Sequence, residues 1–255
     1  MTSEPNQLSF RERLQSGISF ESPIIAPRHA KVEDFRKDHR NRLRQRFTEG
    51  GATAIPDYEL LELVLFRAIP RQDVKPLARR LIEEFGDINH VMAAAPERLQ
   101  KIKGVGASVV LELKVVEATA HRMARVQILE KPILTTWDSL LGYCQTTMAH
   151  LPLEQFRVLF LDRKNVLIAD EAQQTGTIDH VPVYPREVVK RSLELDASAI
   201  ILVHNHPSGD PTPSQSDLQM TEQIEKAAEA LGIVVHDHLI IGKADNFSFR
   251  SAGLL

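Results

Sequence analysis

The run Ala199-Ile-Ile-Leu-Val-His-Asn-His-Pro-Ser-Gly-Asp-Pro-Thr-Pro-Ser-Gln-Ser-Asp217 decides how the C-terminal half of the chain folds. Its first five residues form a short, wholly apolar stretch, which predicts a buried strand. Residues 207–211 are turn formers, and Ser214 is a residue type that caps helices. The run therefore predicts a strand, a tight loop and the start of a helix, in that order.

Two histidines and one aspartate in this run have the spacing of metal ligands. His204 and His206 are two apart at the strand end, so both imidazoles are expected on one side. Ser214 and Asp217 are three apart on the first helical turn and share a face. Two imidazoles and one carboxylate suit Zn²⁺ and leave a fourth tetrahedral position open. The pattern predicts a catalytic site with one Zn²⁺ per chain.

Each of these residues also has a purely structural interpretation. His204 and His206 could be hydrogen-bonded histidines at a strand end. Asp217 could favour the helix N-terminus, where a carboxylate interacts well with the helix dipole. Ser214 could be an N-cap and nothing more. A metal site is favoured by the combination, because one tight loop brings all four residues together.

The sequence around the run predicts an α/β (α+β) domain, because apolar β-rich stretches alternate with helical ones. A turn at 162–165 separates the first two strands, and Gly232 is suited to end the second helix. The expected strands are 155–161, 166–169, 199–203 and 233–241, and the expected helices are 185–195 and 214–231.

The N-terminal half differs in its periodicity. Residues 1–28 are polar and interrupted by prolines, which predicts a flexible tail. Residues 29–125 have helical spacing, with helices expected after Asp57 and from Pro76 to Gly86. Residues 126–132 are expected to be a linker, and 133–255 the α/β domain. The chain is therefore predicted to hold a small all-α domain followed by the α/β domain.

Within the helical half, Ile102-Lys103-Gly104-Val105-Gly106 resembles the turn of a helix-hairpin-helix element spanning 96–125. The resemblance implies contact with a DNA backbone through Lys103, Gly104 and Gly106, because glycines allow close approach and helix-start amides can hold a phosphate. Lys101 and Lys114 would add positive charge. A tight helical corner without a ligand is the alternative.

Composition bounds the remaining possibilities. The 255 residues carry a formal net charge of −3, so DNA binding would need a local patch. The basic run Arg36–Arg46 is either such a patch or a solvated helix face. The single cysteine excludes a disulfide framework and suits a reducing compartment. We find no membrane span or signal peptide, so the cytoplasm is expected.

The motif His204-x-His206, seven residues, Ser214, two residues, Asp217 resembles the signature of the JAMM, or MPN-type, metalloproteases. The surrounding residues resemble the bacterial RadC-like branch of that family. So do the stretches 184–190 and 237–242. Asn205 stands where eukaryotic relatives have Ser or Thr, which cautions against assuming the same substrate.

The resemblance implies a mechanism. His204, His206 and Asp217 would hold zinc, and Ser214 would hydrogen-bond the reacting carbonyl group. The family's glutamate, which handles the proton, is best matched by Glu154, with Glu171 as the runner-up. The implied activity is hydrolysis of a peptide or isopeptide-like amide in a protein substrate that the sequence does not identify.

Other interpretations stay open. The chain could be a DNA-binding accessory protein of repair or recombination, with the MPN-type domain as a scaffold. A metal-dependent nuclease is a third possibility, disfavoured because few carboxylates are available for a two-metal site. His236 and His238 alternate on one predicted strand and could mark a second metal site, but we favour packing beside the first site.

Overall fold

The computed structural model describes residues 32–129, 131–175 and 183–255, and the predicted tail 1–28 lies outside them. The chain divides into two compact units, Met1–Asn41 and Arg42–Leu255. The packing described below belongs to the second unit. None of the helices in the described ranges is long and apolar enough to cross a membrane.

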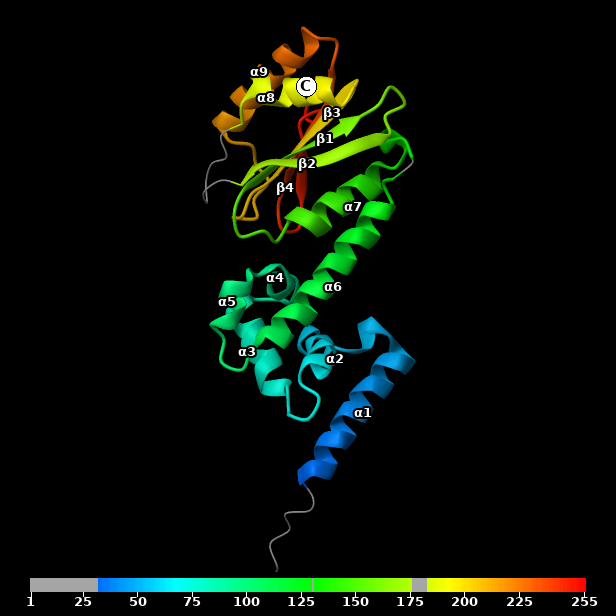
Figure 1. Cartoon of the computed structure of the whole chain (residues 1–255), viewed down its shortest axis with the longest axis vertical. Helices are drawn as coiled ribbons and strands as arrows, with labels where there is room; N and C mark the ends of the chain where they lie inside the picture. Colours follow the sequence, from blue (N-terminus) through cyan, green and yellow to red (C-terminus); the bar gives the residue numbers. More distant parts are fainter. Residues whose placement is uncertain (1–31, 130, 176–182) are drawn as a thin grey trace, which may run out of the picture. The chain divides into compact units, whose positions relative to one another are not determined.

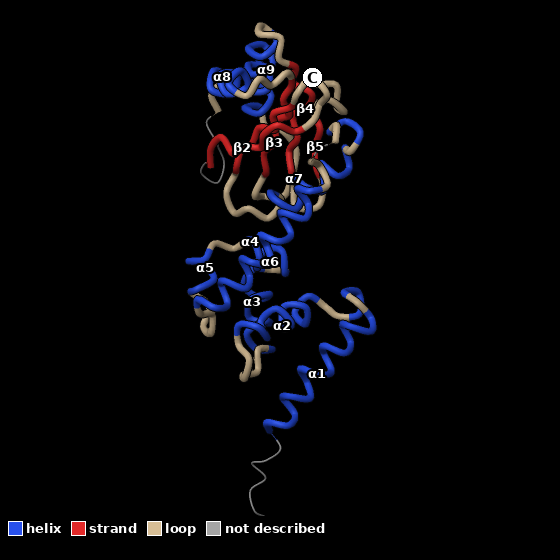
Figure 2. Tube along the Cα trace, turned by 45° about the vertical axis from the view of Figure 1, so that its right-hand side comes forward, coloured by secondary structure: helices blue, strands red, loops and turns tan. Residues whose placement is uncertain are grey.

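The N-terminal part is helical, as the sequence predicts (Figures 1 and 2). Pro76 lies in the first turn of its helix, and Gly86, with a φ of 98°, ends it. The helices are α1 (Val32–Gly50), α2 (Asp57–Ala68), α3 (Lys75–Phe85), α4 (Ile88–Ala93), α5 (Pro96–Gln100) and α6 (Ala107–Val126), with a 3₁₀ turn at Ala52–Ala54.

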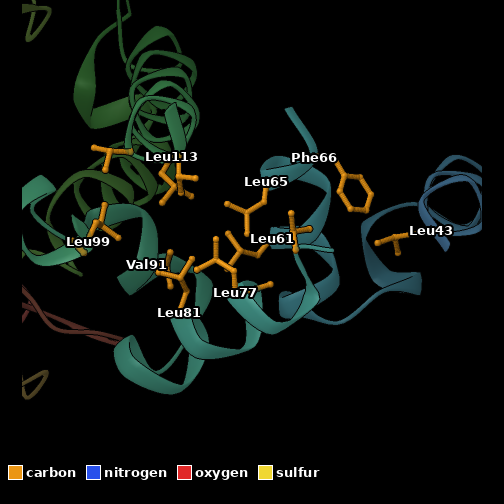
Figure 3. Packing of buried hydrophobic residues seen from close by; sticks show 14 of the residues in the cluster. Leu43, Leu61, Leu65, Phe66, Leu77, Leu81, Val91, Leu99 and Leu113 are labelled. Carbon is orange, nitrogen blue, oxygen red and sulfur yellow. The ribbon is translucent and has the colours of Figure 1, made fainter. Parts of the chain in front are cut away.

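Leucines at helical spacing build the core of this helical region (Figure 3). Leu61, Leu65, Leu81 and Leu113 are fully buried. Each buried side chain of this size contributes about 1.5–3 kcal/mol relative to an exposed one. Leu43 is buried in the same cluster, so the second half of α1 is part of this region.

The last two arginines of the basic run Arg36–Arg46 contact residues of α2. The Arg44 guanidinium lies 5.6 Å from the centre of the Phe66 ring. Arg46 forms an ion pair with Glu59 on α2. The run was expected to be either a phosphate-binding patch or a solvated helix face. Two of its cations, Arg44 and Arg46, contact α2 instead.

Residues 126–132, expected as a linker, also carry packing contacts. Val126 is the last residue of α6, and Ile128 is fully buried in the core of the C-terminal region. Ile133 begins a 3₁₀ turn, Ile133–Thr135, and joins the same core. The segment thus anchors the end of α6 against the sheet that follows.

A five-stranded mixed sheet forms the C-terminal region, with strand order β2-β1-β3-β4-β5. Only β3 and β4 pair in parallel, and α9 connects them; the other neighbours are antiparallel. The elements are α7 (Trp137–Met148), β1 (Gln155–Leu161), β2 (Leu167–Thr175), α8 (Pro185–Glu194), β3 (Ala199–Asn205), α9 (Gln215–Glu229), β4 (Val234–Ile241) and β5 (Asn246–Ser248).

Helices cover both faces of this sheet. Figure 1 shows α8 and α9 together on one side and α7 on the other. On β3, Ile201 and Val203 face the α7 core, whereas Ile200 and Leu202 face the core beneath α8 and α9. All seven residues of β3 are buried, which explains its uninterrupted apolar run. The predicted α/β fold is confirmed, and the same alternation directs His204 towards α9.

Candidate metal centre

His204, His206 and Asp217 each offer one ligand atom, and these atoms lie within 4.8 Å of one another. The two Nε2 atoms are 3.1 Å apart. Asp217 Oδ1 lies 3.4 Å from His204 Nε2, and Asp217 Oδ2 lies 3.6 Å from His206 Nε2. Ligands about 2.0–2.1 Å from a tetrahedral zinc ion lie roughly 3.3 Å apart. The donor set and its spacing fit a borderline divalent ion.

Different elements position the three side chains. His204 is on β3 and completely buried, whereas His206 comes one residue after the strand ends. Its backbone N–H still donates to Ile241 O of β4, which holds it beside the sheet. The side chain of His206 is 17% exposed. The group of three is therefore closed on the His204 side and accessible on the His206 side.

The tautomer of His206 is fixed by the loop that follows it. Nδ1 lies 2.8 Å from the backbone oxygen of Asp210, and a carbonyl can only accept, so Nδ1 carries the hydrogen. Nε2, the atom that faces Asp217, is then the unprotonated nitrogen of the neutral ring. This is the arrangement of a metal-ligating histidine, whose other nitrogen is held by a carbonyl or carboxylate.

A buried chain of hydrogen bonds fixes the tautomer of His204 in the same way. The Thr221 hydroxyl donates to Asp217 O at 2.6 Å, so its oxygen must accept from His238 Nδ1, also at 2.6 Å. His238 Nε2 then accepts from His204 Nδ1 at 2.8 Å. Burial holds the pKa of His238 well below its usual value, which keeps that ring neutral. His204 Nε2 is left with a lone pair facing Asp217.

Asp217 has two functions in the structure. With Ser214 it forms a capping box at the start of α9: Asp217 Oδ2 accepts from Ser214 N, and Ser214 Oγ accepts from Asp217 N. The same carboxylate faces both imidazoles. Burial alone would raise its pKa, but without a metal ion the contacts with His204 and His206, which become donors at Nε2 when protonated, outweigh burial and hold the pKa well below its ordinary value. The capping interpretation and the ligand interpretation are therefore compatible.

Ser214 lies beside the three candidate ligands, and its hydroxyl is already hydrogen-bonded to one of them. Its hydroxyl donates to Asp217 Oδ2 at 2.6 Å and lies 2.8 Å from Ser216 Oγ. To donate to a substrate, the Ser214 hydroxyl would have to release Asp217. The sequence did not point to Ser216, whose hydroxyl lies within hydrogen-bond distance of Ser214.

Glu154 immediately precedes β1 and is close enough to His206 to help raise the pKa of that imidazole, after the larger effect of the Asp217 hydrogen bond. Asn205, which is completely buried between the two histidines, holds this segment. Asn205 Oδ1 accepts from Gln155 N at 2.9 Å, and its Nδ2 donates to Leu153 O at 3.2 Å. Asn205 thus fixes the backbone on both sides of Glu154.

Glu171, the runner-up for the catalytic glutamate, has a different environment. It lies on β2, and both of its carboxylate oxygens accept hydrogen bonds from the Arg191 guanidinium, the shortest at 2.6 Å and 2.9 Å. This pairing lowers the pKa of Glu171. An ionised carboxylate held by an arginine is poorly suited to take up a proton.

The structure separates the two histidines that could have marked a second metal site on β4. His238 belongs to the buried chain behind His204, whereas His236 Nε2 lies 2.6 Å from Asn165 Oδ1 in the β1–β2 turn. His238 therefore packs beside the first site and orients His204, as we expected for both histidines, whereas His236 does not contact that site.

The turn between α5 and α6 has the exposure that a phosphate contact requires. Lys101, Lys103, Gly104 and Gly106 are all exposed, and Gly104 has a φ of 99° that favours glycine. Arg80 of α3 adds a cation, because its Nη2 donates to Lys103 O at 3.0 Å. The expected contribution of Lys114 is not available: its ammonium group bonds Met92 O and Glu117.

Comparison with known proteins agrees with this geometry. Residues 134–254 match the model of the RadC-like JAB domain, and residues 35–110 match that of the UPF0758 N-terminal domain. A UPF0758 protein of Rhodobacter capsulatus is 70% identical over 213 residues, covering 84% of this chain and 100% of the relative. Another from Ruegeria pomeroyi is 67% identical over 219 residues, covering 86% of this chain and 98% of the relative.

The two family matches cover the helical region and the sheet region. The match over residues 134–254 includes all three candidate metal ligands. The chain therefore belongs to the UPF0758 family, whose RadC-like JAB domain here carries His204, His206 and Asp217.

Proposed function

We propose that this protein is a zinc-dependent hydrolase that cleaves peptide or isopeptide-like amide bonds. The observation that supports it most is the convergence of His204, His206 and Asp217, with both imidazoles held in the tautomer that presents Nε2. When bound there, zinc would supply Lewis acidity, which lowers the pKa of water and polarises a carbonyl group.

The residues around the ligands can supply the remaining chemistry. Glu154 immediately precedes β1 and its charge acts on His206, the more exposed ligand, so this carboxylate would take a proton from water and return it to the departing amine. Ser214 and Ser216 place two hydroxyls next to Asp217, where one can donate to the carbonyl oxygen as negative charge develops on it. Asn205 keeps Glu154 in place through the flanking backbone.

The test combines metal analysis with a cleavage assay. Wild-type protein is expected to bind one equivalent of zinc at the group formed by His204, His206 and Asp217. The variants His204→Ala and Asp217→Ala are expected to lose this equivalent. Pooled peptides and isopeptide-linked model substrates serve as probes, with products identified by mass spectrometry. Glu154→Gln should retain zinc and lose cleavage, whereas Glu171→Gln should retain both. Equal zinc content in wild type and both ligand variants would refute the proposed site.

A second candidate function, DNA binding by the helical region, is supported by the exposed Lys101, Lys103 and Arg80 around the Gly104 turn. Backbone contacts of this kind weaken as salt rises. Replacing both lysines by Gln should lower duplex affinity and reduce the slope of log affinity against log salt by about one per lost contact. Chelator should leave the binding unchanged. DNA binding that is insensitive to both the substitutions and salt would contradict this function.

A further inference from the structure

A second group of metal-ligand type lies apart from His204, on side chains that the proposed hydrolase does not use. Asp87, His90 and His150 each offer one ligand atom, and these atoms lie within 4.8 Å of one another. Asp87 precedes α4, His90 lies on α4, and His150 follows α7. All three are half-buried and belong to the compact unit Arg42–Leu255.

The two imidazoles are in direct contact. The ring centres of His90 and His150 lie 4.7 Å apart with an interplanar angle of 72°. Nδ1 of His150 is buried and has no hydrogen-bond partner within the described part of the chain. Leaving such a nitrogen unpaired is unfavourable. No donor or acceptor in the described part of the chain is placed there, so a metal ion or a water molecule in the adjoining cavity would be its partner.

Asp87 supplies the carboxylate and is already oriented. Its Oδ1 accepts from His90 N at 2.9 Å, which caps α4, and its Oδ2 lies 2.8 Å from His90 Nδ1. A carboxylate in this position either completes the ligand set or orients a ligating imidazole, as carboxylates commonly do around zinc. The geometry of Asp87 and His90 serves both arrangements.

A cavity of about 490 Å³ is lined by all three residues, which gives an ion a path and leaves room for water ligands. Its wall also includes Glu84, Arg98 and Lys243. Arg98 and Lys243 are positively charged and would disfavour binding of Mg²⁺ or Ca²⁺, which are held mainly by the negative charge of oxygen ligands. Two imidazoles bind borderline ions, such as Zn²⁺, Co²⁺ or Ni²⁺, whose affinity depends less on net charge.

We propose that Asp87, His90 and His150 form a second transition-metal site, distinct from the His204 centre. Asp87 and His90 belong to the helical region, and His150 follows the helix that covers one face of the sheet. An ion bound there would link the two regions and stabilise their packing. The same cavity includes Pro207, the residue after the ligand His206, so this ion would lie beside the loop that positions the first site.

The experiment uses the full chain with the first site removed by His204→Ala and Asp217→Ala. Zn²⁺ binding is followed by calorimetry, and Co²⁺ binding by its visible absorption, which reports nitrogen ligation. This background is expected to bind one equivalent. Adding His90→Ala and His150→Ala should abolish it, whereas adding His236→Ala, which removes a partly buried histidine outside both groups, should not.

Folding is controlled in the same variants. Two chains are compared: the one lacking His204 and Asp217, and the one that also lacks His90 and His150. Without metal, their melting temperatures should be similar. Zn²⁺ should raise the melting temperature only of the chain that retains His90 and His150. His150→Gln provides a milder variant that should also weaken binding. If the chain lacking His204 and Asp217 binds no ion, or if its ion survives the loss of His90 and His150, the second site does not exist. Neither result depends on whether the first site is a hydrolase.

Discussion

His238 Nε2 lies 2.8 Å from His204 Nδ1, and this contact determines which nitrogen of His204 is free. The chain of donors begins at the backbone carbonyl of Asp217, passes through Thr221 and His238, and ends at His204. A ligand at the start of α9 and a ligand at the end of β3 are therefore connected through buried side chains. This arrangement fixes the His204 ring with Nε2 turned towards Asp217.

His238→Ala is expected to lower zinc affinity by about 10- to 100-fold, the usual cost of removing a group that orients a ligand. The reason is that His204 Nδ1 loses its acceptor and the ring can adopt the wrong tautomer. His238→Gln should recover part of the affinity, because its oxygen can accept from His204 and its NH₂ can donate to Thr221. Zinc affinity is measured by competition with a chelator, with His236→Ala as control. An unchanged affinity in His238→Ala would show that the buried chain has no effect on the ligand.

Glu154→Gln is expected to reduce amide cleavage by about 10²- to 10⁴-fold, the range for losing a general base. Zinc content should stay unchanged, because Glu154 is not among the three ligands. Glu171→Gln is the matched control: it removes a solvent-screened ion pair with Arg191, which contributes little to stability. If Glu171→Gln abolished cleavage while Glu154→Gln did not, the assignment of the two glutamates would be reversed.

Asn205→Ala is expected to affect cleavage more strongly than zinc binding. The substitution leaves Gln155 N and Leu153 O without their side-chain partner, and each lost hydrogen bond costs about 0.5–1.5 kcal/mol of stability. The segment that carries Glu154 then loses its support, while the histidines keep theirs. Urea unfolding, zinc affinity and cleavage are compared in the same preparation. Equal losses of zinc affinity and cleavage would indicate a general loss of folding rather than displacement of Glu154.

The pH dependence follows from His206. Once protonated, its ring donates from Nε2 to Asp217, and this interaction raises the pKa of His206 in the metal-free chain. The stability this gives is fully present below about pH 6.5, the pKa of unperturbed histidine, and is lost as pH rises through the raised pKa. Zinc requires the neutral ring, so zinc affinity should increase over that same rise. Chelator competition and metal-free melting, measured together, should change in opposite directions; a flat zinc affinity across the titration of histidine would contradict this.

Patterns with a local cause were predictable from the sequence. The apolar run of β3 and the 3.6-residue period of the helical half both arise within a few residues. The juxtaposition of His204 and Asp217 was also predictable, because a strand end and a helix start are joined by a short loop. Gly86 and Pro76 marked the bounds of α3 by their backbone preferences alone.

Contacts between distant segments were not predictable. Asn205 holds residues about 50 positions earlier, and nothing in the sequence around it indicates this. His150 carries no local motif, yet packing brings it against His90. Lys114 was expected to add positive charge to the Gly104 turn, but its ammonium group bonds Met92 O and Glu117 instead. In each case the partner is chosen by the tertiary packing, which no single stretch of sequence encodes.

The proposed zinc centre is tested most directly by an anomalous-scattering map from a crystal of the wild-type protein soaked in zinc. We expect a peak within ligand distance of His204 Nε2, His206 Nε2 and the Asp217 carboxylate, about 2.0–2.2 Å from each, with Glu154 facing the remaining position. A crystal with zinc elsewhere but none between these three residues would contradict the proposed centre.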